Sequence, residues 1–134
     1  DGERLVRAAH DMSTGGLIQS LVDSVLRHGV GASVDLAQLQ SRDGVDDFAA
    51  LLSESGARAL VAVPEWAVAA VAAAAEAEDV AWARLGTTGG DMLVVSGTDL
   101  LAEGAEAGSS AGGPLVLDLA ELRRGVEGTL PALF

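Results

Sequence analysis

Residues 9–36, AHDMSTGGLIQSLVDSVLRHGVGASVDL, decide the fold of this chain. Over 17–26 the apolar side chains recur every three or four residues, and polar side chains fill the positions between them. This period is typical of an amphipathic helix with one buried face. The spacing predicts a helix that begins near Gly15 and ends at Gly29, since glycine commonly ends helices.

The residues around this helix predict its cap and the strand after it. Ser13 or Thr14 is the expected N-cap, because a hydroxyl can accept a hydrogen bond from a free N–H of the first turn. Residues 32–36 alternate between apolar and polar side chains, which indicates a half-buried strand.

The rest of the chain continues to alternate helix and strand patterns. Pro64 suits the start of a helix, and two glycines suit a hairpin turn. The expected elements are a short helix marked by Val45, Phe48, Ala49 and Leu52 and capped by Asp43; a strand over 57–63; a helix from Pro64 to Glu78; strands over 81–87 and 91–95 around Gly89-Gly90; a flexible insertion over 97–113; a strand over 115–117; and a helix started by Asp118 and Glu121 and ending near Gly128.

These elements predict the fold class. The strand over 57–63 is apolar on both faces apart from Arg58, so we expect it to be central and covered on two sides. Helices that alternate with strands, together with one hairpin, favour a mixed sheet. We therefore expect one α/β (α+β) domain over 1–134, with helices covering a mixed sheet of four or five strands.

Composition excludes several kinds of chemistry. The chain has 134 residues, no Cys and a net charge of −12, and its eight basic residues are all Arg. Without Lys there is no Walker-type phosphate loop and no Schiff base. Without Cys there is no thiol nucleophile and no Cys-based metal site. The negative charge and the few aromatic residues also argue against a nucleic-acid surface.

Targeting signals are also absent from the pattern. The apolar run over 67–75 is shorter than the roughly 20 residues of a membrane span. No basic segment followed by an apolar segment opens the chain, so we expect a cytoplasmic protein without a membrane partner. The first residue is Asp1 rather than Met, which leads us to expect a fragment of a longer enzyme.

The first candidate site is the motif His10-Asp11-Met12-Ser13-Thr14-Gly15-Gly16-Leu17. Glycines at a helix start let a backbone approach a ligand closely, and the free N–H groups there favour an anion. A capped helix after a tight turn explains the same residues equally well. A catalytic triad is excluded, because triad members come from separated segments and these residues are nearly consecutive. We predict no catalytic residue and no metal ligand.

The second candidate site is Ser53-Glu54-Ser55-Gly56-Ala57-Arg58, just before the strand over 57–63. Arg58 could bind a phosphate bidentately, and Glu54 could bind a donor-bearing ligand. The alternative is an ion pair that supports the turn. Because Arg58 is a charged residue in an apolar strand, it needs a partner of opposite charge, and Glu54 and Asp11 are the candidates.

The order and spacing of four segments resemble a known family. These segments are AHDMSTGGL, GVGASVDL, LLSESGARALVAVP and LGTTGGDMLVV. Together they resemble the C-terminal domain of the AIR-synthase-related superfamily. Within it, His-Asp-x-Ser-x-Gly-Gly-Leu with Ser-Glu-Ser-x-x-Arg most resembles the last domain of the phosphoribosylformylglycinamidine synthases. Thr14 stands where many relatives have Asp.

The resemblance implies a function in purine biosynthesis. Such a synthase uses ATP, magnesium and glutamine-derived ammonia to convert formylglycinamide ribonucleotide to its amidine. It implies that ATP and magnesium bind mainly outside this chain, that this chain alone is inactive, and that the partners are the other domains, a glutaminase and a small accessory subunit. By match to the two motifs, it implies these substrate- or phosphate-binding residues: His10, Asp11, Ser13, Gly15, Gly16, Ser53, Glu54, Ser55 and Arg58.

Two other functions remain open at the level of sequence. One is a free-standing α/β interaction or phosphate-sensing domain, in which the negative charge serves a cationic partner. The other is the same domain of another AIR-synthase-related enzyme.

Overall fold

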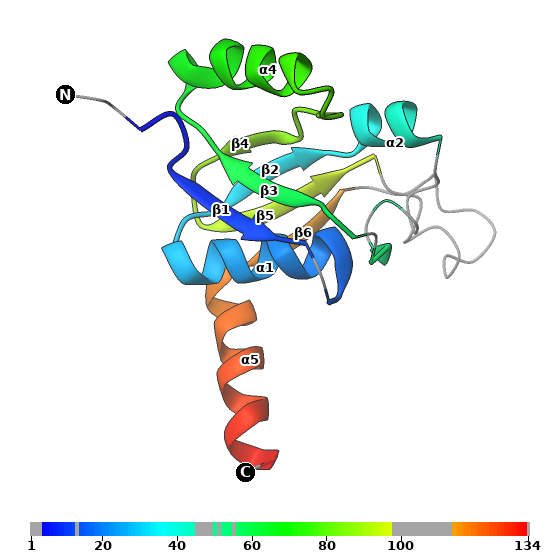
Figure 1. Cartoon of the computed structure of the whole chain (residues 1–134). Helices are drawn as coiled ribbons and strands as arrows, with labels where there is room; N and C mark the ends of the chain where they lie inside the picture. Colours follow the sequence, from blue (N-terminus) through cyan, green and yellow to red (C-terminus); the bar gives the residue numbers. More distant parts are fainter. Residues whose placement is uncertain are drawn as a thin grey trace, which may run out of the picture.

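Helices and strands alternate along the computed structural model, which describes residues 4–12, 14–44, 50, 52–54, 56–97 and 114–133 (Figure 1). In chain order the elements are β1 (Ala8–Asp11), α1 (Gly16–His28), β2 (Ala32–Asp35), α2 (Ala37–Asp43), β3 (Ala59–Ala62), the 3₁₀ turn η1 (Glu65–Ala67), α4 (Val68–Ala77), β4 (Gly86–Thr88), β5 (Met92–Ser96), β6 (Leu115–Asp118) and α5 (Leu119–Leu133).

The strands form two sheets. β1 and β3 pair antiparallel, and a four-stranded sheet has the order β4-β2-β5-β6. β2 runs parallel to β5, whereas β4 and β6 are antiparallel to their neighbours. The predicted mixed α/β architecture is therefore confirmed, and β1 and β3 form an additional small sheet.

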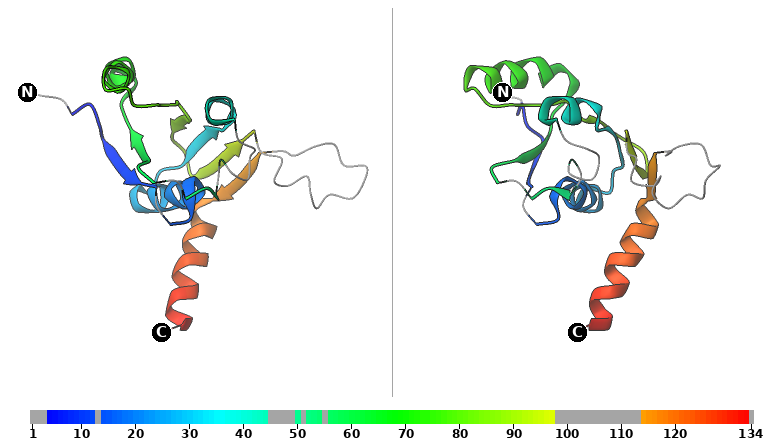
Figure 2. Two further views of the ribbon diagram at one scale, coloured as in Figure 1. Left: turned by 45° about the vertical axis from the view of Figure 1, so that its right-hand side comes forward. Right: turned by 90° about the vertical axis from the view of Figure 1, so that its right-hand side faces the viewer.

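The core lies between α1 and the four-stranded sheet. Leu17, Leu21 and Val25 follow one face of α1 and are 0–4% exposed, and Leu93 and Val95 of β5 are fully buried. α1 also contacts β1 and β3. This helix therefore joins the two sheets, which diverge from it in Figure 2. Burial of each such side chain contributes about 1.5–3 kcal/mol.

The predicted amphipathic helix is α1, and its C-terminal end is where the sequence places it. Gly29 has a left-handed φ of 64°, and its N–H donates to the Val25 carbonyl at 2.8 Å. The predicted cap is wrong. The N-cap is Gly15, whose φ of 83° is a conformation that glycine adopts without strain, so neither Thr14 nor Ser13 takes that position.

β3 is not the covered central strand that its apolar residues predict. Among the described strands it pairs only with β1, and its residues alternate between exposed and half-buried. Leu60 packs against the core, whereas Val61 is 44% exposed. Residues apolar on both faces are typical of a strand covered twice, but here only the face toward α1 is covered.

The predicted hairpin around Gly89-Gly90 is also wrong. β4 and β5 do not pair with each other, because β2 lies between them. Gly31, just before β2, donates its N–H to the Gly90 carbonyl and accepts from the Gly89 N–H, both at 2.8 Å. The two glycines therefore lie beside the N-terminal end of β2. β4 covers only the last two residues of the strand predicted over 81–87 and continues to Thr88.

α2 is a helix that the sequence analysis does not predict. The Ala37 N–H donates to Asp35 Oδ1 at 2.9 Å, and Leu39 reaches the core. A helix of seven residues has too few periodic apolar positions to be recognised. The short helix predicted over 45–52 lies mainly outside the described residues, and so does the predicted insertion beyond Gly97.

The two remaining predicted helices are present. η1 and α4 follow Pro64 and together form the first of them. Asp118 caps α5 as predicted, since its Oδ1 accepts from the N–H groups of Ala120 at 2.8 Å and Glu121 at 3.1 Å. α5 continues past Gly128 to Leu133, so the predicted end is wrong. None of the described helices combines the length and apolarity that a membrane crossing needs.

Candidate functional site

One hydrogen bond brings the two predicted motifs together. The Gly15 N–H donates to Glu54 Oε1 at 2.8 Å, although the two residues are 39 positions apart. Glu54 comes from the loop before β3, and Gly15 begins α1. A carboxylate is stabilised at the positive end of a helix dipole. Glu54 therefore accepts from one of the N–H groups that the sequence suggested for binding a ligand anion.

The backbone explains why two glycines occupy this turn. Gly15 and Gly16 have φ values of 83° and 69°, both in the left-handed region. A side chain at Gly15 would also meet the Cγ of Gln19 at 3.0 Å. A glycine pair therefore lets the chain turn sharply from β1 into α1 and present the Gly15 N–H to Glu54.

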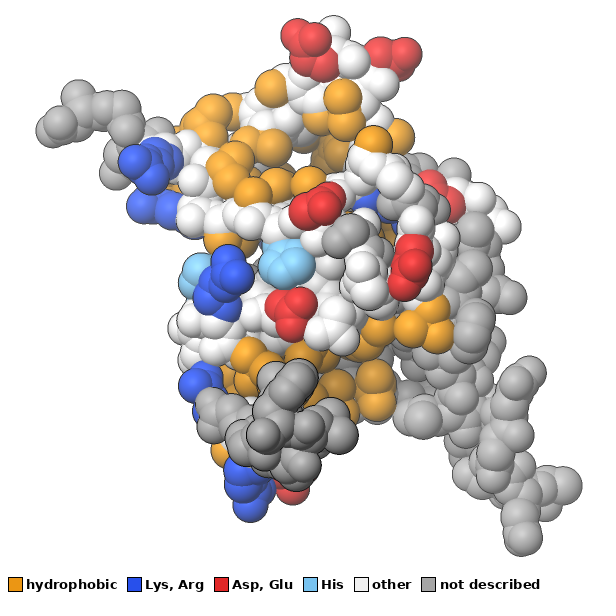
Figure 3. All heavy atoms as spheres, turned by 60° about the horizontal axis from the view of Figure 1, so that its bottom comes forward, with side chains coloured by type: hydrophobic (Ala, Val, Ile, Leu, Met, Phe, Trp, Pro, Cys, Tyr) orange, Lys and Arg blue, Asp and Glu red, His pale blue; other side chains and the backbone are white. Residues whose placement is uncertain are grey.

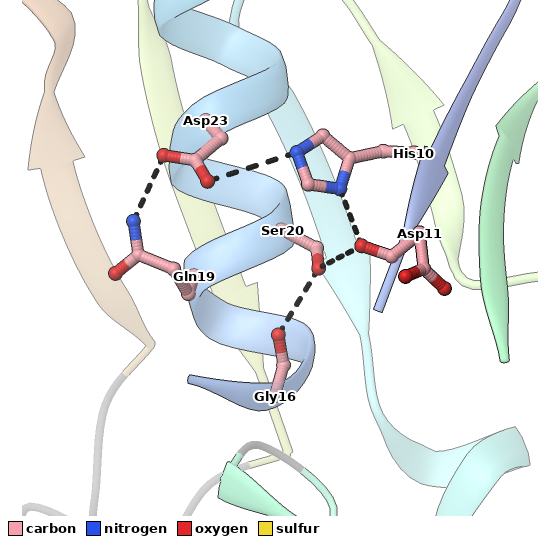
Figure 4. A network of polar contacts seen from close by, with 6 residues as sticks. All are labelled: His10, Asp11, Gly16, Gln19, Ser20 and Asp23. Atoms are coloured by element: carbon pink, nitrogen blue, oxygen red, sulfur yellow. Dashed lines mark hydrogen bonds and ion pairs between the residues drawn. The ribbon is translucent and has the colours of Figure 1, made fainter. Parts of the chain in front are cut away.

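His10 connects the end of β1 to the polar face of α1 (Figure 4). Its Nδ1 donates to the Asp11 carbonyl at 2.7 Å, because a carbonyl oxygen can only accept. Its Nε2 lies 3.6 Å from Asp23 Oδ2, and Gln19 Nε2 donates to the other oxygen of Asp23 at 2.8 Å. The imidazole is thus held from both sides.

A buried hydroxyl supports the same junction. Ser20 is 1% exposed, and its Oγ lies 3.1 Å from the Gly16 carbonyl and 3.5 Å from the Asp11 carbonyl. Figure 4 shows Ser20 between the first turn of α1 and the end of β1. The single Ser20 proton is therefore donated mainly to the Gly16 carbonyl, which is the closer of the two.

Arg58 has a different partner from the two that the sequence analysis names. Its Nη2 donates to Asp43 Oδ2 at 2.6 Å, and both side chains are about one-fifth to one-quarter exposed. Asp43 is the last residue of α2, so this ion pair ties α2 to the start of β3. The Arg58 carbonyl accepts from the Met12 N–H at 3.0 Å, which joins the two motifs a second time.

Most of the predicted site residues therefore lie around one junction. The residues around the start of α1 are His10, Asp11, Gly15, Gly16 and Glu54. Arg58 pairs with Asp43, and its carbonyl accepts from the Met12 N–H. Ser53 is half-buried and has a polar contact of its own. Ser13 and Ser55 lie outside the described residues.

Sequence reasoning missed the residues that support this junction. They are Gln19, Ser20, Asp23 and Asp43. Gln19 and Asp23 are four residues apart on α1, and this spacing is the signal that could have indicated their contact.

The described residues offer no metal-binding cluster, and the two hollows described below have no basic lining. They contain no group of three His, Cys, Asp or Glu side chains that could hold an ion. Two shallow hollows are present, and the larger, of about 480 Å³, is lined by Ala37, Gln38, Ser41, Trp82 and Ala83. Neither hollow is lined by an Arg or His that could hold a triphosphate.

The geometry defines a class of protein: an α/β domain whose glycine-rich helix start is closed by a carboxylate from a second loop. Residues 1–99 match the family model described as "AIR synthase related protein, C-terminal domain". The chain belongs to this family, which confirms the resemblance seen in the sequence.

Two relatives of the chain carry the same protein name. It is 42% identical over 97% of its length to a phosphoribosylformylglycinamidine synthase subunit PurL from Renibacterium salmoninarum, and 43% identical over 97% to the one from Thermobifida fusca. The chain spans only 15% and 14% of the length of these relatives.

Solved structures share the fold. Over 88% of the chain, T. maritima PurL superposes with a TM-score of 0.65 in a complex with ATP and 0.67 in a complex with FGAR. The chain covers 19% and 18% of those two structures, and sequence identity is 19% and 18%. The likeness supports the fold.

Proposed function

We propose that this chain is the C-terminal domain of a phosphoribosylformylglycinamidine synthase. The family model, which matches residues 1–99, and the relatives named PurL, which match 97% of the chain, support this assignment. The complete enzyme would be a cytoplasmic ligase that forms the amidine of formylglycinamide ribonucleotide from ammonia, with ATP and magnesium. Its partners would be the other domains, a glutaminase and a small accessory subunit.

The chemistry of the donor set limits what this domain does in that reaction. No group of three potential metal ligands lies among the described residues, and we propose that ATP and magnesium bind mainly outside this chain, as the family resemblance implies. No step through ATP is therefore assigned to these residues. Their proposed task is to hold a rigid loop against substrate bound between this domain and the rest of the enzyme.

The hydrogen bond between Gly15 and Glu54 carries this proposal. It fixes the glycine-rich turn to the second motif, and His10 and Asp11 flank that turn. We propose Gly16 and Ser53 as further substrate-binding residues, and by their match to the family motifs also Ser13 and Ser55, which lie outside the described residues. Arg58 pairs with Asp43 and ties the start of β3 to α2. A loop held before substrate arrives loses less conformational entropy on binding.

The phosphate-sensing alternative gains no support from this geometry. At the start of α1 the Gly15 N–H, one of the groups that could hold a free phosphate, already donates to the Glu54 carboxylate.

The proposal is tested on the complete gene product. Purified protein should convert formylglycinamide ribonucleotide to the amidine when ATP, magnesium and ammonia are supplied, and residues 1–134 alone should hydrolyse no ATP. Turnover by residues 1–134 alone, or a complete protein that is folded but forms no amidine, would contradict the proposal.

A further inference from the structure

α4 has an apolar sequence but no buried residue. Its ten residues read VAAVAAAAEA, and its polar residue lies near the C-terminal end. A helix that is apolar all round is normally buried on all sides. In this structure none of its residues is buried, and η1 is the element that it contacts most. One side of α4 is half-buried, namely Val68, Val71, Ala72 and Ala75, and the opposite side lacks a cover.

The segments on either side of α4 share this exposure. Val61 on β3, Trp66 in η1 and Val80 after α4 are 44%, 55% and 57% exposed. We call residues 61–80 the 61–80 surface. Figure 3 shows hydrophobic side chains gathered between α4 at the top and the N-terminal segment at the upper left. Clustered exposure of this kind marks an interaction site, whereas single exposed apolar residues do not.

Charge decides what kind of partner fits. Residues 61–80 contain Glu65, Glu76, Glu78 and Asp79, and because Arg84 pairs with Glu65 at 2.8 Å, the other three carboxylates determine the charge of the surface. Two copies of the chain placed face to face would bring these carboxylates together, and like charges across an interface are unfavourable. The complementary partner has an apolar centre with Lys or Arg at its rim.

The relatives are much longer than this chain. The chain matches 14–15% of the length of its PurL relatives, so the rest of a comparable protein is available to cover it. We infer that the 61–80 surface is the face on which another domain of the same larger polypeptide docks, with an apolar patch and a basic rim. This inference rests on the proposed function only in assuming the larger polypeptide.

Hydroxyl-radical footprinting of the complete gene product tests the inference. Trp66 should be protected from oxidation, whereas Met92, which is 43% exposed on β5, should remain reactive and serves as the internal control. Reaction of Trp66 at the rate expected for its 55% exposure would overturn the inference. So would a complete gene product that holds no domain besides this one. Neither readout depends on amidine formation, so failure of the proposed function is detected separately.

A pair of matched variants sharpens the test. Ala70→Glu places a charge in the centre of the surface, and Ala120→Glu places one at an exposed helical position on α5. Burial of an unpaired charge is costly, so Ala70→Glu should raise the reactivity of Trp66 several-fold in the complete protein. Ala120→Glu should leave it unchanged. Equal Trp66 reactivity in both variants and in the parent would overturn the inference.

Discussion

The two sheets of this domain differ in how completely the chain covers them. In the four-stranded sheet Leu93 and Val95 are fully buried and Val34 is 4% exposed, because α1 packs against these strands. In the region of β1, β3 and α4 the strands alternate between exposed and half-buried residues, and α4 has no buried residue. The first region therefore has a closed apolar core, whereas the second leaves apolar residues exposed on its outer face.

This difference separates what makes the domain fold from what it offers to other proteins. Free energy of folding comes mainly from apolar area removed from water, and most of that burial lies around α1 and β5. The candidate site lies where the two regions meet, at the end of β1 and the start of α1. Its geometry therefore depends on both.

The largest expected effect is a truncation in the closed apolar core. Leu93→Ala should lower the free energy of unfolding by about 2–5 kcal/mol, because it leaves a cavity at a fully buried position. Val61→Ala, at an exposed position in the other region, should cost under about 1 kcal/mol in the chain alone. Urea denaturation followed by circular dichroism measures both. Similar losses in the two variants would remove the distinction between the regions.

A smaller effect is expected where β2 and β4 approach each other. Gly86 lies so close to the Ser33 carbonyl that a Cβ would overlap it, so Gly86→Ala should cost about 1–3 kcal/mol. Gly125→Ala is the matched control, since nothing lies within 4 Å of a Cβ there and alanine favours the helix by up to about 1 kcal/mol. Thermal denaturation should show opposite shifts. A neutral Gly86→Ala would mean that β2 and β4 pair less closely than described.

The ion pair between Arg58 and Asp43 should have a moderate effect. A double-mutant cycle with Arg58→Ala and Asp43→Asn should give a coupling energy of about 1 kcal/mol, since both side chains are partly exposed. If Arg58 does not pair with Asp43 and instead binds a substrate phosphate in the complete enzyme, the double-mutant cycle gives no coupling energy between Arg58 and Asp43. Arg58→Ala then raises KM and leaves the fold intact.

The smallest effect on stability is expected at Glu54. Glu54→Ala removes the acceptor of the exposed Gly15 N–H bond and should cost about 0.5 kcal/mol, whereas Glu54→Gln keeps an acceptor oxygen and should cost less. In the complete enzyme Glu54→Ala should raise the KM for formylglycinamide ribonucleotide, with partial rescue by Glu54→Gln. Equal KM values for the two variants would mean that the negative charge of Glu54, rather than its hydrogen bond, is what matters.

Local signals in the sequence predicted the elements whose partners lie nearby. α1 with its Gly29 end, the alternation of β2 and the Asp118 cap all follow from periods and caps of a few residues. The prediction that β3 is covered on both faces is wrong, because apolar residues on both faces do not reveal whether the second face is covered within this chain. The hairpin was misjudged because Gly89-Gly90 fits a tight turn equally well.

The candidate site was predicted by residue type and not by contact. The family motifs assign both Gly15 and Glu54 to substrate or phosphate binding. Their hydrogen bond could not be predicted, because it joins residues 39 positions apart and depends on the path of the loop before β3. The partner of Arg58 was missed for the same reason, because Asp43 reaches it through the unpredicted helix α2.

Hydrogen exchange, measured on residues 1–134 and on the complete protein, tests the central contrast most directly. In the chain alone the amides of β5 should exchange slowly, and those of α4 should exchange much faster because no residue of that helix is fully buried. In the complete protein α4 should become slow while β5 changes little. Equal protection of α4 and β5 in the chain alone, or an α4 that stays fast in the complete protein, would contradict this account.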